Sequence, residues 1–199
     1  MKILLPTKKN IAVVANYLKY GAVVVAPTET AYGLLVDATN NQAVKKIFKI
    51  KGRQANKTVA LVVADLKMAQ QYGKFSKDAV NLAKKYWPGP LTVVIPVKKY
   101  GLRKLSPQIL LKKMVGMRIP KHYWLRQVIK KVNKPLTATS ANLAGKKNIY
   151  SFKLAKAQLK NRQVDYFVNG QNLPERPVST IVKVVGSNVT VLRLGGIKI

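Results

Sequence analysis

The sequence contains few acidic residues, one histidine and no cysteine among its 199 residues. The six acids are Glu29, Asp37, Asp65, Asp78, Asp165 and Glu175. Their scatter along the chain argues against hydrolysis by paired carboxylates and against a metal cage built from protein ligands. The absence of cysteine excludes thiol catalysis, thiolate zinc sites and disulfides. Hydroxyls, amides and cations therefore remain to carry any chemistry, and we expect no metal held by side chains alone.

The one histidine, His122, cannot form a cluster of histidine metal ligands. It could serve a single serine as a base. Because it stands at the start of a predicted helix, we expect it to be a surface or capping residue instead.

Long hydrophobic runs are also absent. The apolar run in residues 1–6 is too short for a secretion signal. No other run approaches the roughly 20 residues of a membrane-spanning helix. We therefore expect a cytoplasmic protein that has no membrane partner.

Basic residues, in contrast, are abundant. The chain has 37 lysines and arginines against 6 acids, which gives a formal net charge of +31. Such a charge opposes compactness and favours a polyanionic partner, of which nucleic acid is the commonest. The alternative is a lysine-rich proteome, in which surface lysines have no partner, and the sequence leaves both explanations open.

The hydrophobic pattern predicts helices and strands that alternate within one α/β domain covering residues 1–199. Helices are expected within residues 11–18, 41–48, 66–72, 77–86, 125–132 and 152–159. Strands are expected at residues 22–26, 58–64, 91–97, 114–119, 136–139, 166–169, 180–185 and 189–194. Residues 98–113 are basic and have no clear period, so we expect a mobile, RNA-facing or lid loop there.

Two of these strands run into short polar loops. The apolar run at residues 23–26 is followed by Pro27-Thr28-Glu29-Thr30, and the strand at 136–139 by Ser140-Ala141-Asn142. Proline cannot continue a central strand, so the first loop begins at Pro27. Ligands of open α/β sheets sit beyond the carboxyl ends of strands, which predicts that the two loops form walls of one pocket.

Five motifs in fixed order resemble those of the YrdC-type threonylcarbamoyl-AMP synthase family. They are Pro27-Thr28-Glu29-Thr30-Ala31-Tyr32-Gly33-Leu34, the Lys51-Gly52-Arg53 triplet, Trp87-Pro88-Gly89-Pro90-Leu91-Thr92, Ser140-Ala141-Asn142 and Ser179-Thr180-Ile181. Arg118 and Leu192-Arg193-Leu194-Gly195 extend the agreement over almost the whole chain. The resemblance is to the short form of the family and implies a single-domain, twisted mixed β-sheet flanked by helices, with a concave basic surface.

The resemblance also implies an activity. Enzymes of this family condense L-threonine, bicarbonate and ATP into threonylcarbamoyl-adenylate and release pyrophosphate. The product serves threonylcarbamoyladenosine modification of tRNA, through partner proteins of a transfer complex. The expected cofactor is Mg²⁺ that accompanies ATP, bound mostly through phosphates and water. Because no protein nucleophile is needed, catalysis would consist of positioning and charge neutralisation, which suits a chain rich in cations.

Matching the motifs residue by residue implies the following roles. Lys51 and Arg53 would neutralise the triphosphate and act as the catalytic groups. Threonine would be held by Thr28, Thr30, Arg118 and Ser179. Nucleotide contacts would come from Lys51, Arg53, Ser140, Asn142 and Arg193, although Ser140 and Asn142 could also bind threonine, and Arg118 a phosphate. Glu29, the only acid within a motif, is a candidate for a proton or metal role, or else fixes its loop through backbone amides.

Three positions depart from the family pattern: Gln54 and Leu194 stand where proline is common, and Ala144 where serine is common. They leave the charged and hydroxyl groups in place and affect the loop shapes. The competing hypothesis is a YrdC-like RNA-binding module, for tRNA, ribosomal or double-stranded RNA, that has lost the synthase activity. The charge of +31 fits either hypothesis.

Overall fold

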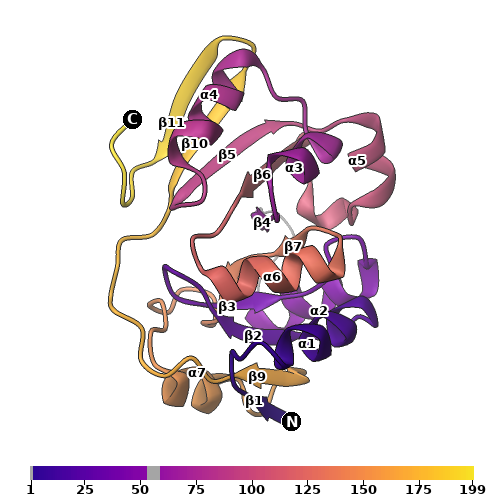
Figure 1. Cartoon of the computed structure of the whole chain (residues 1–199), viewed down its shortest axis with the longest axis vertical. Helices are drawn as coiled ribbons and strands as arrows, with labels where there is room; N and C mark the ends of the chain where they lie inside the picture. Colours follow the sequence, from indigo (N-terminus) through magenta and orange to yellow (C-terminus); the bar gives the residue numbers. More distant parts are fainter. Residues whose placement is uncertain (1, 53–58) are drawn as a thin grey trace.

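The computed structural model describes residues 2–52 and 59–199, and it divides the strands between two mixed sheets (Figure 1). The first sheet has the order β1-β9-β2-β3-β8, with β1 (Lys2–Leu4), β9 (Tyr166–Val168), β2 (Val24–Pro27), β3 (Tyr32–Leu35) and β8 (Thr139–Ser140). The second has the order β11-β10-β5-β6-β4-β7, with β11 (Asn188–Arg193), β10 (Thr180–Val185), β5 (Leu91–Pro96), β6 (Met114–Arg118), β4 (Leu61–Val62) and β7 (Leu136–Thr137). The predicted mixed α/β class is confirmed, with two sheets in place of the one expected.

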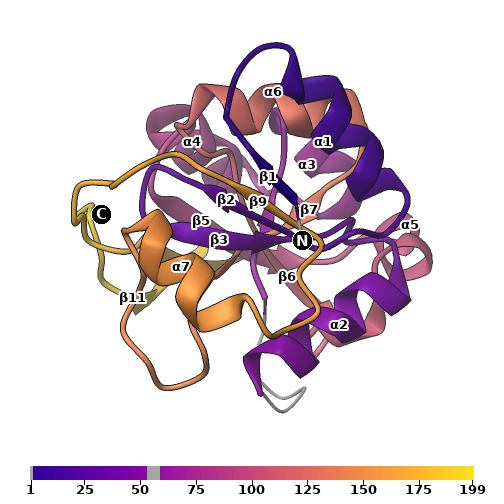
Figure 2. The same ribbon diagram turned by 90° about the horizontal axis from the view of Figure 1, so that it is seen from below.

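The helices within the described residues surround these sheets. They are α1 (Asn10–Lys19), α2 (Asn41–Lys51), α3 (Leu66–Tyr72), α4 (Lys77–Tyr86), α5 (Lys99–Lys104), α6 (Tyr123–Val132) and α7 (Phe152–Leu159). Seen from below, α1 and α6 lie along one side of the first sheet, while α7 and α2 lie toward the other (Figure 2). Among the described helices, none is long and apolar enough to cross a bilayer.

Polar side chains start several of the helices. The side chains of Asn40, Ser76 and His122 accept hydrogen bonds from the backbone N–H groups of Ala43, Ala79 and Leu125. These bonds satisfy N–H groups that the first turn of a helix leaves free. The capping role expected for His122 is therefore confirmed.

The segment Leu136–Thr139 was expected to form one strand that ends before Ser140, but residues 136–140 pair in both sheets. Leu136 and Thr137 pair with β4 in the second sheet, whereas Thr139 and Ser140 pair with β3 in the first. Between them, the N–H of Ala138 donates to the carbonyl of Ala60 at 2.8 Å. The chain thus crosses from one sheet to the other within a few residues, and this crossing brings the ends of several strands together.

Two expectations from the sequence are corrected. Residues 98–113 are not an irregular loop, because they contain α5 and a 3-10 turn (Pro107–Ile109), and Leu105 and Ile109 are buried in the core. Pro27 is the last residue of β2 and pairs with Tyr32, where the strand was expected to stop before it. The pairing of β2 with β9 involves only Val24 and Val25, so the missing N–H of Pro27 interrupts no hydrogen bond to β9.

The close packing of α5 depends on Gly101. A Cβ at this position would lie 2.5 Å from the carbonyl oxygen of Tyr72 and 2.6 Å from the Cγ2 atom of Val97. Alanine favours helices by about 1 kcal/mol over glycine, yet backbone atoms cannot move away cheaply. We therefore expect Gly101→Ala to lower the free energy of unfolding by about 1–3 kcal/mol in urea denaturation.

Gly116→Ala is the matched control for this substitution. Its Cβ would lie no closer than 3.4 Å to the side chains of Thr92 and Val94, so the control should change stability much less. Equal stability of Gly101→Ala and the wild-type protein would show that α5 can move away from α3.

Candidate functional site

A cavity of about 250 Å³ lies where the two sheets meet. The described residues that line it come from β3, β5, β6, β8, β10 and β11, from the loops after β2 and β8, and from the segments preceding β4, β8 and β10. They are Thr28, Thr30, Ala31, Tyr32, Gly33, Val59, Ala60, Thr92, Arg118, Ala138, Thr139, Ser140, Asn148, Val178, Ser179, Ile181 and Arg193. The predicted convergence of the two polar loops on one pocket is confirmed.

The loop after β2 is closed by the side chain of Thr28. Its hydroxyl donates to the carbonyl of Ala31 at 2.7 Å and accepts from the N–H groups of Thr30 and Ala31 at 3.1 and 3.2 Å. Thr28 is buried, so these local bonds use most of the capacity of its hydroxyl. Thr30 is less buried, and its hydroxyl oxygen lies 3.1 Å from that of Thr28 and 3.4 Å from Nη2 of Arg118. Thr28 thus shapes the loop, while Thr30 is placed to contact a ligand.

Arg118 and Glu29 form a buried ion pair beside the cavity. Nη1 of Arg118 donates to Oε1 of Glu29, and the two side chains are only 7% and 8% exposed. Oε2 of Glu29 is buried and has no hydrogen-bond partner within the described part of the chain. Glu29 therefore fixes its loop through a guanidinium rather than through the backbone amides expected from the sequence. The guanidinium is held by Glu29 on one side and lines the cavity as well.

The charge of this carboxylate also affects the pKa of His122. Burial lowers the pKa of its imidazole from the usual value, and the negative charge of Glu29 partly opposes that shift. His122 does not line the cavity, so its geometry supports the capping role and not that of a base.

Lys51 is buried, although lysine is among the residue types most often found exposed. It is the last residue of α2 and is 5% exposed. Its ammonium donates to the carbonyls of Ser140 and Asn142 at 2.6 and 2.9 Å, and to Oδ1 of Asn142 at 3.2 Å. Helix α2 ends here because Gly52 adopts a left-handed conformation with φ of 59°. Lys51 therefore holds the loop that begins at Ser140, and it lies behind the wall of the cavity.

Asn142 shares this bracing position. It is buried, accepts a hydrogen bond from the hydroxyl of Ser140, and donates through Nδ2 to the carbonyl of Lys146. Of the residues predicted on this loop, Ser140 lines the cavity and Asn142 does not. Arg53, the other predicted catalytic cation, lies outside the described residues.

The opposite wall is built around Ser179. Its carbonyl accepts hydrogen bonds from Nε and Nη2 of Arg193 at 3.2 and 2.7 Å. Its hydroxyl oxygen lies 3.1 Å from the same Nη2 and 3.0 Å from the hydroxyl oxygen of Thr92. Partial burial of the guanidinium, followed by the positive charge of Arg118, lowers the pKa of Arg193 from its usual value. The group stays charged near neutral pH. Because Glu29 already compensates the charge of Arg118, whereas no acid pairs with Arg193 within the described residues, Arg193 gives the cavity its affinity for anions.

Several residues that line the cavity were not predicted from the sequence. Tyr32 and Thr92 lie inside quoted motifs, but neither was selected as a ligand contact. The hydroxyl of Tyr32 instead ties the start of β3 to the loop after β9, since it donates to the carbonyl of Gln171 at 2.7 Å and accepts from the N–H of Gly170 at 2.9 Å. Asn148 also lines the cavity, and no signal in the sequence could have identified it.

Comparison with known proteins agrees with this arrangement. Residues 16–195 match the profile of the Sua5, YciO and YrdC proteins, which is described as telomere recombination. The chain belongs to this family. A relative from Methanocaldococcus jannaschii is 32% identical over 193 residues, which are 96% of this chain and 88% of that protein. A curated threonylcarbamoyl-AMP synthase from Pyrococcus abyssi is 35% identical over 138 residues, 69% of this chain and 40% of that protein.

Solved structures share the fold over nearly the full chain. The crystal structure of P. abyssi Sua5 complexed with L-threonine superposes with a TM-score of 0.89 at 29% identity, covering 98% of this chain and 58% of that one. The crystal structure of E. coli YciO has a TM-score of 0.85 at 22% identity, covering 98% and 94%. The chain thus spans most of the length of some members of the Sua5, YciO and YrdC family and about half of others.

The buried position of Lys51 leads to a prediction about stability. Lys51→Met keeps the length of the side chain but leaves three oxygen acceptors without the ammonium, and a hydrogen bond to a charged group contributes about 1.5–3 kcal/mol. We expect the free energy of unfolding in urea to fall by at least about 2 kcal/mol. The control is Lys49→Met on the exposed face of α2, which should change it by less than about 0.5 kcal/mol. If both variants match the wild type, Lys51 does not brace the loop.

Proposed function

We propose that this protein is a threonylcarbamoyl-AMP synthase, which condenses L-threonine, bicarbonate and ATP into threonylcarbamoyl-adenylate and pyrophosphate. The observation that carries the proposal is the convergence of Thr30, Arg118, Ser140, Ser179 and Arg193 on one cavity. All five belong to the residues that carry the resemblance to the family, and a relative with the same fold is described as complexed with L-threonine. Curated relatives from P. abyssi and Bacillus subtilis are named threonylcarbamoyl-AMP synthase.

The size and charge of the cavity suit threonine. Its volume of about 250 Å³ is a little below the usual range for drug-sized ligands, which suits an amino acid. Arg118 would pair with the threonine carboxylate through the part of its guanidinium that Glu29 does not occupy. Thr30 would bind a polar group of the substrate, with Thr28 keeping the loop in shape and Ser179 bounding the far wall.

The nucleotide would then extend past Ser140 and toward Arg193. In this arrangement Ser140 and Arg193 contact it directly, whereas Lys51 and Asn142 act by fixing the loop on which Ser140 lies. A catalytic role for Arg53 on the triphosphate rests on the family motif alone. Magnesium would arrive with ATP, because no group of three or more Asp, Glu or His side chains within residues 2–52 and 59–199 could hold it.

The protein positions the reactants and stabilises charge, and no covalent intermediate with the protein is needed. The threonine ammonium loses one proton, and bicarbonate takes up a proton and releases water to give carbon dioxide. The amine bonds to the carbon of carbon dioxide and loses a second proton as the carbamate forms. A carbamate oxygen then attacks the α-phosphorus, and the bond to pyrophosphate breaks. Arg118 holds the amino acid, and Arg193 faces the negative charge that develops on the phosphates.

We place the product in the modification of tRNA, with partner proteins of a transfer complex as its acceptors and the cytoplasm as the location. The second candidate function is an RNA-binding module without synthase activity. It is favoured by one observation, the net charge of +31, which exceeds what a small anionic substrate requires. A concave basic surface, which the resemblance to the family implies, would be the RNA-binding surface of such a module.

Release of pyrophosphate separates the two candidates. With ATP and Mg²⁺ present, we expect the purified protein to release pyrophosphate only when threonine and bicarbonate are supplied together, because the carbamate is the nucleophile. Omitting either should reduce the rate to background, as should replacing threonine by L-threoninol, which lacks the carboxylate that Arg118 would bind. Background rates in the complete mixture would contradict the synthase and leave the RNA-binding module.

A further inference from the structure

A second cavity, of about 550 Å³, lies on the flank formed by α3, α5 and the C-terminal end of α6 (Figure 1). Its described lining residues are Thr39, Gln71, Tyr72, Tyr100, Arg103, Lys104, Asn133 and Lys134. It shares none of them with the cavity between the sheets. Neither the family motifs nor the proposed synthesis of threonylcarbamoyl-adenylate gives it a role.

Two tyrosines form the apolar part of this cavity. Tyr72 is buried, and its ring meets that of Tyr100 edge to face, with centroids 5.4 Å apart. Tyr72 is itself held by the N–H of Lys98, which donates to its carbonyl at 2.8 Å. Tyr100 is 47% exposed, so its ring packs against the buried Tyr72 and still offers surface to a ligand. Such a ring can stack on an unpaired base.

Three cations surround the tyrosines. Arg103 and Lys104 are exposed on the last turn of α5, and the ammonium of Lys134 donates to Oδ2 of Asp37 at 2.8 Å. Asp37 is almost completely buried and neutralises Lys134 only. The described lining residues include no acid, so two positive charges remain without a negative partner there. Burial, followed by the influence of Tyr100, raises the pKa of Tyr72 above its usual 10, and the phenol adds no negative charge near neutral pH.

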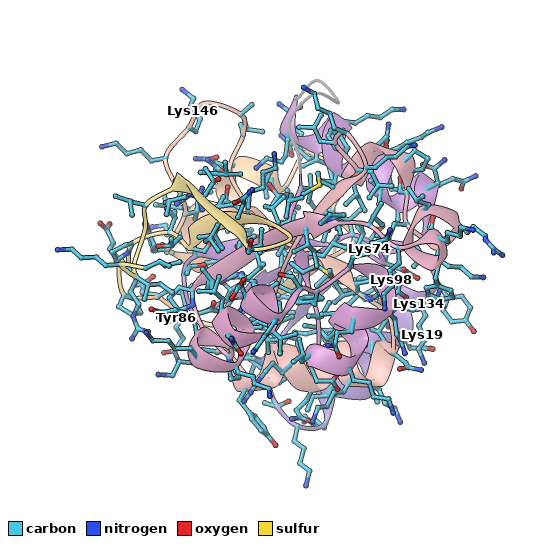
Figure 3. All side chains as sticks on the ribbon, turned by 90° about the horizontal axis from the view of Figure 1, so that it is seen from above. Lys19, Lys74, Tyr86, Lys98, Lys134 and Lys146 are labelled. Carbon is cyan, nitrogen blue, oxygen red and sulfur yellow. The ribbon has the colours of Figure 1, made fainter. Side chains whose placement is uncertain are left out.

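The positive charge continues beyond the cavity. Lys74 and Lys98 are exposed and lie on the same side of the molecule as Lys134 when it is seen from above (Figure 3). The ammonium of Lys98 is oriented by the carbonyl of Gln70, to which it donates at 2.6 Å. Several cations on one side of the molecule suit a chain of successive phosphates better than one small anion.

We propose that this surface, called here the α5 flank, binds an unpaired segment of RNA. The α5 flank comprises Gln71, Tyr72, Tyr100, Arg103, Lys104, Asn133 and Lys134. A base would stack on Tyr100, phosphates would lie against Arg103 and Lys104, and the side-chain amides of Gln71 and Asn133 would meet ribose hydroxyls. Duplex RNA cannot use the tyrosine because its bases are already stacked. The inference does not depend on the chemistry in the cavity between the sheets.

The test measures binding of a fluorescent single-stranded RNA of about ten nucleotides by anisotropy, over a range of salt concentrations. Arg103→Gln combined with Lys104→Gln should weaken binding at low salt and reduce the salt slope by about 0.7 for each phosphate that the variant no longer neutralises. The matched control is Lys153→Gln combined with Lys156→Gln on α7, which removes the same charge at the far end of the molecule from α5 (Figure 1). We expect the control to keep nearly the wild-type slope.

Tyr100→Leu separates stacking from charge. We expect it to weaken binding of the single strand by about 5- to 150-fold and to leave binding of the same strand annealed to its complement unchanged. All three variants should retain the wild-type rate of threonine-dependent pyrophosphate release, so an inactive synthase cannot be mistaken for a failed RNA site. The proposal is overturned if the wild type does not bind the strand at low salt, or if the α7 control loses as much affinity as the α5 variant. It is overturned too if Tyr100→Leu affects duplex and single strand equally.

Discussion

A buried ion pair between Arg118 and Glu29 joins the two sheets at the edge of the cavity. Arg118 ends β6 in the second sheet, and Glu29 lies in the loop after β2 in the first. Two charges removed from water are costly unless they are paired, and removing one partner of such a pair destabilises proteins by about 3–5 kcal/mol. The pair therefore constrains the distance between the sheets, and the space that remains between them is the cavity.

The rest of the site is arranged around this constraint. The chain crosses between the sheets at Ala138, which places Ser140 on the wall facing the loop that Glu29 anchors. Lys51 then fixes the continuation of that wall from behind. A rigid site of this kind suits a reaction whose catalysis consists of positioning, because the cost of ordering the groups has been met during folding.

Cations do two different kinds of work in the molecule. Lys51 and Arg118 are buried and hold polar groups or a carboxylate of the protein, so they shape the site. Arg103 and Lys104 are exposed, and no hydrogen bond or ion pair of their side chains is found within the described part of the chain. The first kind belongs to the small-molecule chemistry, and the second carries the inference that the α5 flank binds RNA.

Much of this structure could be predicted from local patterns in the sequence. His122 caps its helix as expected, and the pocket forms where strands end in short polar loops. The patterns could not show that Leu136–Thr137 and Thr139–Ser140 pair in different sheets, because the period of a strand does not identify its neighbours. Lys51 illustrates a second limit. A lysine beside a glycine resembles an exposed helix end, and only the tertiary structure places carbonyls around its ammonium.

In the proposed site Arg118 serves two carboxylates, that of Glu29 and that of the substrate. Arg118→Lys tests this double role, because an ammonium can replace the guanidinium toward Glu29 but cannot reach two carboxylates with a fixed fork. Isothermal titration calorimetry should show that the wild type binds threonine more tightly than L-threoninol by roughly 10- to 150-fold, the contribution of a hydrogen bond to a charged group. We expect Arg118→Lys to lose most of this preference while it stays folded. A preference that is unchanged in the variant would rule out this double role of Arg118, since the substrate carboxylate would then be bound by another group.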